Sequence, residues 1–408
     1  MKTNATFTKA DILIPSFHDD AGLMSRWAVI ACDQFTSQPE YWERCRKFVG
    51  SHPSTLGYIM PEAYLGTAEE KAQKELIDGN MRRFNSSEYY GFNGFMYIRR
   101  RLPDGTVRPG LVGKIDLEDY SFAEGSEPKV RPTEKTVVER IPARVSIREK
   151  AAVELPHILV LCDDREGIFG FLEENREKLI PLYDFDLMEG GGHLEGFGVT
   201  GSICRKLSDM ILGNEKMNGA MAYAVGDGNH SLAAAKAHWE NVKKATGMED
   251  GPARYVLCEV TPVQCPAIEF EPIYRLLKNC DVEELTDALE REATFGEDGD
   301  MELVCSEGSK RFGFKKQTHN LPLGTLQNFI DSYVSAHPGT VCDYIHGLDA
   351  LRRLSEEKNA AGIICPGIDK SELFSYVEKF GVLPRKTFSM GEAESKRYYV
   401  EMRKIRKD

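Results

Sequence analysis

The sequence lacks the features of exported, membrane-spanning and disulfide-stapled proteins. Met1–Phe17 contains no apolar run of signal-peptide length, and no segment approaches the ~18–20 apolar residues that span a bilayer. The ten cysteines are scattered and include no C-x-x-C pair, so a disulfide framework and a Cys-pair zinc site both lack their spacing. We therefore expect a cytoplasmic protein whose thiols are mostly buried as small hydrophobic groups.

The sequence also lacks an excess of positive charge. It has 64 acidic residues against 52 basic ones, which gives a formal net charge of −12. A general nucleic-acid binder needs a basic face that displaces counterions, so this balance argues against nucleic acid as a partner. A small basic pocket for a phosphorylated ligand is still compatible with it. The 36 glycines are the unusual feature, because several of them crowd into two short stretches.

Predicted strands and helices alternate along the 408 residues, and no internal repeat is found. Apolar runs bounded by turn residues predict strands at 27–32, 95–98, 111–117, 157–162, 220–225, 258–260, 361–365 and 397–403. Helical patterns and capping signals predict helices at 40–48, 67–84, 204–212, 232–245, 282–292, 325–335, 348–358 and 369–381. This alternation predicts an α/β or mixed α+β fold. We place a boundary near residue 266, with a ligand-binding α/β domain over 1–265 and a smaller α+β domain over 266–408 that contributes to the site.

A glycine turn between a predicted strand and helix is the sharpest local signal, and it reads Gly226-Asp-Gly-Asn-His-Ser231. Such a turn lets the backbone approach a ligand closely, and the following helix offers free amides and the positive end of its dipole to an anion. Asp227 is a candidate base or divalent-metal ligand and His230 a candidate proton carrier. Gly226, Gly228, Asn229 and Ser231 are candidate contacts to the phosphorylated ligand. A glycine turn in which Asp and Ser only cap the helix explains the same residues.

A second glycine run comprises Gly190, Gly191 and Gly192, followed by His193. Three consecutive glycines cost backbone entropy, which favours a loop that bends sharply or approaches a ligand closely. The run matches neither the P-loop nor the dinucleotide fingerprint. We predict that these four residues contact a phosphorylated ligand; a flexible surface loop is the alternative.

Two further segments carry weaker signals. Asp33 follows a predicted buried strand, and ligands of α/β proteins often lie beyond the carboxyl ends of strands, so Asp33 is a candidate general base. A helix-entry loop is the equal alternative there. Arg385 and Lys386 follow Pro384 in a turn that could grip an anion, although a solvated basic turn also accounts for them.

Five long motifs follow one another along the chain: ACDQFTSQPEYW (Ala31–Trp42), YDFDLMEGGGH (Tyr183–His193), VGDGNHSLAAAK (Val225–Lys236), EFEPIYRLL (Glu269–Leu277) and LPRKTFSMG (Leu383–Gly391). Together they resemble the bacterial family catalogued as domain of unknown function 1015, over nearly the whole chain. That name implies no function.

The glycine turn of that family usually reads Asp-Gly-His-His-Arg, which resembles the nucleotide-handling motif of the ParB and sulfiredoxin-like superfamily, including its free-serine kinases. Asp227, Gly228 and His230 match this motif, whereas Asn229 replaces its first His and Ser231 its Arg. The resemblance implies a mixed-sheet core elaborated by insertions, in which this loop and the helix start bind nucleotide phosphates. A bidentate arginine contact to phosphate is lost here.

The same resemblance implies that an acidic residue from an early loop activates the substrate hydroxyl, and Asp33 holds that position. Lys236 or Lys386 is a candidate to replace the missing arginine. The favoured hypothesis is a small-molecule kinase that uses ATP or another phosphate donor, with Mg²⁺ at Asp227, on a hydroxylated metabolite such as free serine. The fold analogy with ParB does not extend to DNA, because no basic helix run is present.

Two alternatives stay open. The first is a non-catalytic regulator that binds a nucleotide or phosphorylated metabolite. The second is a metal-dependent hydrolase that uses His157, His193 and His230, although no H-x-x-x-H or H-x-H spacing supports it. The sequence leaves the oligomeric state open, and a homodimer is compatible with it.

Overall fold

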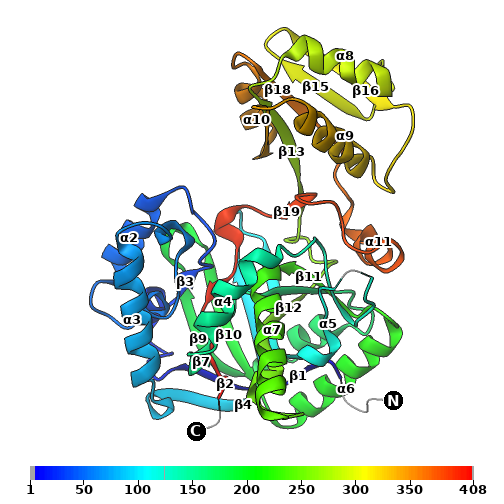
Figure 1. Cartoon of the computed structure of the whole chain (residues 1–408). Helices are drawn as coiled ribbons and strands as arrows, with labels where there is room; N and C mark the ends of the chain where they lie inside the picture. Colours follow the sequence, from blue (N-terminus) through cyan, green and yellow to red (C-terminus); the bar gives the residue numbers. More distant parts are fainter. Residues whose placement is uncertain (1–4, 124, 407–408) are drawn as a thin grey trace. The chain divides into compact units, whose positions relative to one another are not determined.

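The computed structural model describes residues 5–123 and 125–406, with the backbone alone at positions 140 and 143. The chain folds into two compact units, the first formed by Met1–Ile268 with Glu392–Asp408 and the second by Glu269–Gly391 (Figure 1). The predicted boundary near residue 266 lies close to the start of the second unit. The predicted domain 266–408 extends beyond the end of that unit, because the last segment of the chain folds into the first one.

A ten-stranded mixed sheet forms the centre of the first unit. Its strands are β1 (Phe7–Thr8), β2 (Ala10–Pro15), β4 (Tyr89–Arg101), β5 (Val107–Asp116), β6 (Val130–Pro132), β8 (Leu159–Cys162), β9 (Ile180–Asp186), β10 (His193–Val199), β11 (Tyr223–Asp227) and β12 (Tyr255–Pro262). Their order is β6-β11-β8-β12-β5-β4-β10-β9, with β1 on β5 and β2 on β4. Only β6–β11 and β8–β12 are parallel among the described pairs, so the predicted α/β class with a mixed sheet is confirmed.

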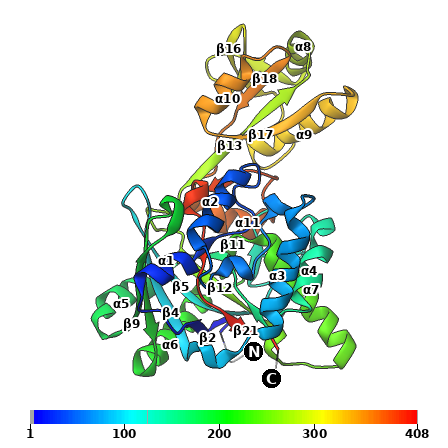
Figure 2. The same cartoon turned by 90° about the vertical axis from the view of Figure 1, so that its left-hand side faces the viewer.

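Helices cover both faces of this sheet. They are α1 (Ala21–Trp27), α2 (Pro39–Val49), α3 (Glu69–Arg83), α4 (Ile141–Arg148), α5 (Ile168–Glu174), α6 (Gly201–Met217) and α7 (Asn229–Thr246). Successive strand residues alternate between two cores, as the pleat requires: Tyr97 packs in the core shared with α6 and α7, and Met96 in the core shared with α1 and α2. Helices α4 and α7 lie side by side (Figures 1 and 2).

Four short strands join the chain end to the first unit. They are β3 (Val29–Ile30), β7 (Val153–Glu154), β20 (Tyr398–Tyr399) and β21 (Arg403–Lys404). β20 pairs with β3 and β21 with β7, both antiparallel.

Buried ion pairs fix this terminal segment in place. Arg397 lies 2.7 Å from a carboxylate oxygen of Glu259 and 2.5 Å from one of Glu401, and all three side chains are at most 4 % exposed. Arg403 lies 2.7 Å from Glu154. Removing one partner of such a pair would leave a buried charge uncompensated. These contacts explain why residues 392–408 belong to the first unit.

Two predicted strands were wrong in extent. Residues 27–32 were expected to form one strand, but α1 ends at Trp27 and β3 contains only two residues, because a short apolar run fits a buried helix end as well as a strand. Residues 397–403 form β20 and β21 rather than one strand, with Met402 between them in an isolated bridge to Leu13.

The second unit contains a seven-stranded sheet whose described pairs are all antiparallel. Its elements are β13 (Phe270–Lys278), α8 (Val282–Glu292), β14 (Ala293–Phe295), β15 (Met301–Cys305), β16 (Gly308–Phe314), α9 (Pro322–Ala336), β17 (Val341–His346), α10 (Leu348–Ser355), β18 (Ala360–Ile364), α11 (Leu373–Phe380) and β19 (Phe388–Met390). The strand order is β14-β16-β15-β18-β13-β17, with β19 on β13. The two ends of the unit meet, because Gly391 N–H donates to the Glu269 carbonyl at 3.2 Å.

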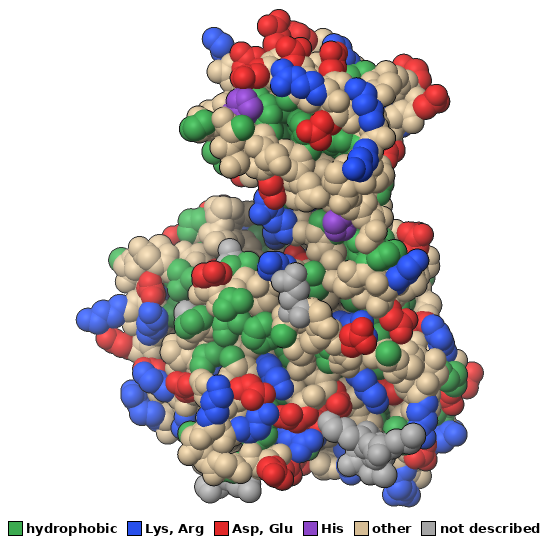
Figure 3. All heavy atoms as spheres, turned by 45° about the vertical axis from the view of Figure 1, so that its right-hand side comes forward, with side chains coloured by type: hydrophobic (Ala, Val, Ile, Leu, Met, Phe, Trp, Pro, Cys, Tyr) green, Lys and Arg blue, Asp and Glu red, His purple; other side chains and the backbone are tan. Residues whose placement is uncertain are grey.

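The surface carries mixed charge. On the face shown in Figure 3, Lys and Arg side chains are interspersed with Asp and Glu rather than gathered into one basic area. Within residues 5–123 and 125–406, no helix is both long and apolar enough to cross a membrane.

Candidate functional site

Strand pairing brings the predicted glycine turn next to His157. β11 runs antiparallel to β8, with Val225 opposite Val160 and, after a register shift, Asp227 opposite Leu159. The end of β11 therefore lies beside the residues that precede β8. As a result, Ser231 Oγ on α7 lies 3.4 Å from Nε2 of His157.

The pairing of β20 with β3 brings a cation to the same place. Ala31 N–H donates to the Arg397 carbonyl at 2.9 Å, which lays the residue before Arg397 alongside the loop that contains Asp33. Lys396 Nζ then lies 3.7 Å from Oδ2 of Asp227, and its charge also acts on Asp33. Two predicted carboxylates, more than 190 residues apart in sequence, thus share one ammonium group.

His157 is held in a fixed orientation. Its side chain is buried, and Nδ1 lies 2.6 Å from the Tyr399 hydroxyl. That hydroxyl accepts a hydrogen bond from Cys32 N–H at 3.3 Å, which ties the imidazole to the loop after β3. Sequence reasoning considered His157 only as a metal ligand. It missed the positioning of this imidazole between Tyr399 and Ser231, because both contacts depend on strand pairing between distant segments.

Asp33 is ionised in this environment. Burial opposes its ionisation, but the electrostatic interaction with the His157 side chain, the Gln34 amide at 3.1 Å and the charge of Lys396 outweigh it and lower the pKa of the Asp33 carboxyl. The neighbouring Cys32 behaves oppositely, because burial and the Asp33 charge raise the pKa of its thiol to about 12. Cys32 is therefore a neutral thiol and not a nucleophile.

The glycine turn has the geometry of a close backbone approach. Gly228 has φ +81° and precedes α7, and a Cβ at this position would lie 3.0 Å from the Ile158 Cα. Its N–H donates to Oδ1 of Asp227 at 2.8 Å. An 18-residue helix therefore starts here, with its amide groups and the positive end of its dipole directed towards the site of Lys396 and His157.

His230 and Asn229 complete the glycine turn. His230 Nε2 lies 3.3 Å from the Val137 N–H, from which it can accept. Asn229 is buried, and its Oδ1 makes no hydrogen bond within the described part of the chain. Direct contact of His230, Asn229 and Ser231 with a ligand stays a prediction, as does contact with Gly226.

The second glycine run is packed against the protein itself. A Cβ on Gly191 would lie 2.3 Å from the Tyr398 hydroxyl, and one on Gly192, where φ is +87°, would lie 2.1 Å from the Arg101 carbonyl oxygen. Gly190 also has a positive φ of +76°. Close internal packing therefore accounts for these glycines, and their contact with a phosphorylated ligand stays a prediction.

His193 contacts two carboxylates at the β9–β10 end. Its Nε2 lies 2.7 Å from Asp184 and its Nδ1 2.7 Å from Asp186. The glycine run is linked to the terminal segment through Arg100, whose guanidinium donates to the Gly191 carbonyl at 2.9 Å and to the carbonyls of residues 394–396. Arg100 thereby helps to hold the segment that carries Lys396.

The contact of the predicted cations Arg385 and Lys386 with a ligand stays a prediction. Arg385 and Lys386 belong to the second unit, where Arg385 Nε donates to the Tyr344 hydroxyl at 2.6 Å. Lys236 does not replace the missing arginine, because its Nζ donates to the Leu117 carbonyl and pairs with Glu240, both at 2.9 Å. The cation that the structure places beside Asp227 is Lys396, and its sequence surroundings give no signal that could have identified it.

The donor set suits a weakly held Mg²⁺ rather than a closed metal site. Within the described residues, no group of three or more His, Cys, Asp and Glu side chains is placed to hold a metal ion. Asp33 and Asp227 are hard oxygen donors, and Mg²⁺ commonly uses one or two carboxylates together with substrate phosphates and water.

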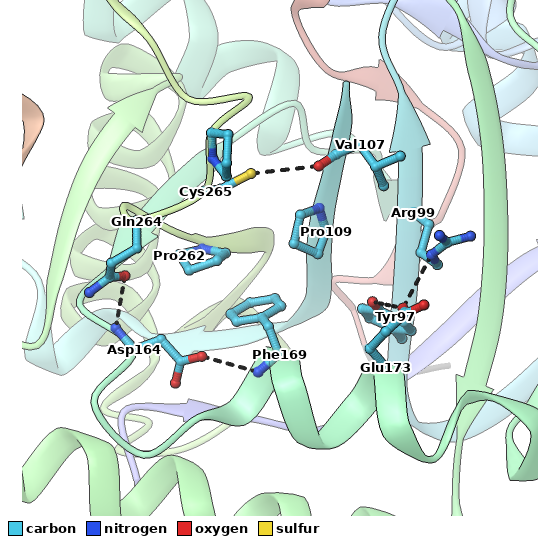
Figure 4. A pocket seen from close by; sticks show the side chains of 11 residues that line it. Tyr97, Arg99, Val107, Pro109, Asp164, Phe169, Glu173, Pro262, Gln264 and Cys265 are labelled. Carbon is cyan, nitrogen blue, oxygen red and sulfur yellow. Dashed lines mark hydrogen bonds and ion pairs between the residues drawn. The ribbon is translucent and has the colours of Figure 1, made fainter. Parts of the chain in front are cut away.

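A cavity of about 440 Å³ lies at the carboxyl ends of β8 and β12, the ends opposite to His157 (Figure 4). Tyr97, Phe169 and Pro262 line it, and its polar groups are paired within the protein: the Tyr97 hydroxyl donates to Glu173 at 2.9 Å, and Arg99 lies 3.2 Å from the same carboxylate. None of the predicted catalytic residues lines it.

Comparison with known proteins yields a family and several likenesses of fold. A family model described as a protein of unknown function (DUF1015) matches residues 18–352. No curated protein matches the chain. A solved free serine kinase in complex with AMP is 13 % identical with a TM-score of 0.40, covering 72 % of this chain and 91 % of that chain.

Two other solved structures are similar at the same level. A conserved hypothetical protein from Pyrococcus furiosus is 13 % identical with a TM-score of 0.37, covering 72 % of this chain and 94 % of that one. SbnI with a C-terminal truncation, from Staphylococcus aureus, is 11 % identical with a TM-score of 0.36, covering 69 % and 82 %. These are distant likenesses of fold and assign no activity.

Proposed function

The chain belongs to the DUF1015 family, whose function is unknown, and we propose that it is a small-molecule phosphotransferase. The observation that supports this most is the grouping of Asp33, Asp227 and Lys396 at the N-terminus of α7. Phosphoryl transfer requires mainly positioning and charge stabilisation, and this group offers backbone amides, one ammonium and two carboxylates for it.

The proposed step transfers a phosphoryl group from ATP, or from pyrophosphate, to an acceptor hydroxyl. The acceptor oxygen forms a bond to phosphorus while the bond from phosphorus to the leaving phosphate oxygen breaks, and Asp33 takes the hydroxyl proton. Because its pKa is lowered, the Asp33 carboxylate is a weak base. It therefore mainly orients the hydroxyl and takes the proton late in the transfer. Lys396 and the first amides of α7 bind the phosphate oxygens.

Mg²⁺ is the proposed metal, and Asp227 is the residue that would hold it together with the phosphates of the donor. Bound there, the ion would neutralise charge that develops on the transferred group. The Asp227 carboxylate otherwise accepts from Gly228 N–H and pairs with Lys396, so this chain keeps it oriented towards the start of α7.

The experiment is a turnover assay on the purified chain. ³¹P NMR would follow ATP or pyrophosphate with Mg²⁺ and a panel of hydroxylated amino acids, with free serine first. A new phosphomonoester signal, lost in Asp33→Asn and kept in the exposed variant Asp209→Asn, is expected. The absence of product with both donors and the whole panel would refute the phosphotransferase.

A non-catalytic phosphate-binding regulator is the second candidate, because the anion site needs no base. Asp33→Asn separates the two functions. An enzyme would lose turnover while still binding the donor, whereas a regulator would bind with unchanged affinity and show no turnover in either form. The metal-dependent hydrolase gains no support, since His193 pairs with Asp184 and Asp186 and is not grouped with His157 and His230.

A further inference from the structure

A cavity of about 250 Å³ lies beside the candidate site in the first unit: His157 and Ser231 line it, whereas Asp33, Asp227 and Lys396 do not. One end is polar and is formed by Cys32, His157, Ser231 and Tyr399. The remainder is mainly apolar, and its wall includes Ile59, Met60, Leu65, Ile147, Leu155 and Ala234. Ser231 and Ala234 stand three residues apart on α7, so one face of that helix runs from the polar end into the apolar part.

The charged groups in the apolar part of the wall are already paired. Arg148 lies 2.5 Å from Glu154, and Arg144 forms an ion pair with Glu62. Each cation therefore faces a carboxylate of the protein, and the wall offers no excess charge to a ligand. A ligand body that fills this part gains by burying apolar surface and not by ion pairing.

The volume identifies which reactant the cavity fits. Pockets for drug-sized ligands run from roughly 300 to 1,000 Å³, so a cavity of about 250 Å³ is small for a nucleotide. The hydroxyl of Ser231 and the imidazole of His157 at its polar end suit a hydroxyl group of the ligand.

We propose that this cavity binds the phosphate acceptor, and that the acceptor is a small alcohol with an uncharged apolar body rather than free serine. This inference rests on the proposed phosphotransferase. The acceptor hydroxyl lies at the end formed by His157 and Ser231, beside the phosphate site at the start of α7. Its apolar body lies between α7, α4 and the segment that contains Ile59 and Met60, against Ala234 and Ile147.

The first test measures binding without any phosphate donor. Linear 1-alkanols from two to eight carbons would be titrated into the full chain by ligand-observed NMR. Burial of one methylene is worth about 0.8 kcal/mol, which corresponds to about fourfold in affinity. We expect the affinity to rise about two- to fourfold per carbon until the cavity is filled. Affinity that does not depend on chain length would overturn the inference.

The second test uses matched variants. Ile147 lines the cavity and is 41 % exposed, so Ile147→Glu places a carboxylate in it at little cost to folding. Met248 is 42 % exposed and outside the cavity, so Met248→Glu is the control. Ile147→Glu should weaken 1-hexanol binding at least tenfold and the control should not. Equal behaviour of the two variants would overturn the inference.

A filling variant tests the same volume from α7. Ala234→Leu occupies the cavity, whereas Ala245→Leu adds the same side chain to an exposed position of that helix. Only Ala234→Leu should reduce the alkanol chain length at which the affinity stops rising.

The outcomes distinguish this inference from the proposed function. Alkanol affinity that rises with chain length, together with an absence of turnover, would refute the phosphotransferase and keep the cavity as a binding site. Turnover of free serine unchanged in Ile147→Glu, with no slope, would refute this inference alone.

Discussion

Among single residues, Lys396 is the cation that acts on both candidate carboxylates of the site. Its ammonium lies 3.7 Å from Asp227 and helps to lower the pKa of Asp33. With side chains only 11 % and 20 % exposed, Lys396 and Asp227 are shielded from most of the solvent that weakens surface ion pairs. Its removal would leave two carboxylates repelling each other and the incoming phosphate.

We therefore predict that Lys396→Met lowers turnover about 100-fold or more, as the loss of one charge-stabilising donor does in other enzymes. Steady-state rates from the ³¹P assay would measure it. Lys244→Met, at an exposed position of α7, is the control and should keep its activity. A Lys396→Met enzyme with normal turnover would remove this lysine from the site.

Asp33 predicts a pH dependence of stability. Its folded-state pKa is lower than the ordinary value of about 3.9, so the ionised carboxyl stabilises the fold above the unfolded-state pKa. That contribution is lost as the pH falls through the folded-state value. The free energy of unfolding of the wild type, relative to Asp33→Asn, should be constant from pH 7 to about pH 5 and should decrease below about pH 4.

Urea denaturation at each pH would measure this difference. The exposed variant Asp209→Asn provides the reference for removing a carboxylate as such. A difference between wild type and Asp33→Asn that increases towards acid pH would contradict the lowered pKa.

The sequence predicted the acidic residues of the site better than their partners. Asp33 and Asp227 could be proposed because each follows an apolar run or a glycine turn, which are local patterns. Lys396 and the oriented His157 could not, because they reach the site through the β20–β3 and β11–β8 pairings. Such pairings join segments far apart in sequence, and no local pattern encodes them.

At the scale of elements, the start of α7 is the part that positions the phosphate site. Both ends of this helix carry a glycine in the left-handed region: Gly228 at φ +81° and Gly247 at φ +70°. Only Gly228 lies against Ile158, whereas a Cβ on Gly247 would meet open space. Gly247 therefore serves as a control for the left-handed conformation at a position away from the candidate site.

We predict that Gly247→Ala destabilises the fold by about 1–2 kcal/mol, the cost of the left-handed conformation for a residue with a Cβ. Gly228→Ala should cost more, because its Cβ would also lie 3.0 Å from the Ile158 Cα. Only Gly228→Ala should also weaken ADP binding. Denaturation curves and calorimetric titration would give both quantities. Equal ADP affinity of the two variants would place the phosphate site elsewhere.

Long elements with strong local signals were predictable. Helix α8 was predicted over the same residues that the structure shows. Asp281 caps its first turn, because its carboxylate accepts hydrogen bonds from the N–H groups of Glu283 and Glu284. The segment 27–32 was not, because its six apolar residues suit a helix end and a strand equally. The Trp27 indole donates to the Val400 carbonyl at 2.9 Å, a tertiary contact that the local pattern does not indicate.

At the scale of the whole molecule, the second unit interrupts the first one. Its two ends lie together, with Phe270 opposite Met390 and Gly391 N–H bonded to the Glu269 carbonyl. The residues grouped at the start of α7 all belong to the first unit. Insertions with adjacent ends are tolerated because the host fold is little disturbed.

We predict that residues 269–391 can be replaced by a short Gly-Ser linker and that the shortened chain still folds. Thermal unfolding followed by circular dichroism would measure it, and residues 269–391 expressed alone should unfold cooperatively as well. An unfolded shortened chain would contradict the division into units. Donor affinity of the shortened chain also tests the predicted contribution of Arg385 and Lys386, whose loss should weaken binding.

Of the two boundaries of the second unit, the sequence gives a signal only near the first. Composition and pattern change near residue 266, close to where the second unit begins. The return of the chain at residue 392 depends on buried pairs such as Arg397 with Glu259, which join residues 138 positions apart. No property of residues 392–408 alone indicates them as part of the first unit.

The most direct test of the account is where a nucleotide binds. The chain would be labelled with ¹⁵N-glycine, which reports on its 36 glycines, and titrated with ADP in a two-dimensional NMR experiment. We predict that the signals of Gly226 and Gly228 shift in a saturable manner while that of Gly247 stays in place. Saturable shifts that leave Gly226 and Gly228 unchanged, or no shifts at millimolar ADP, would contradict it.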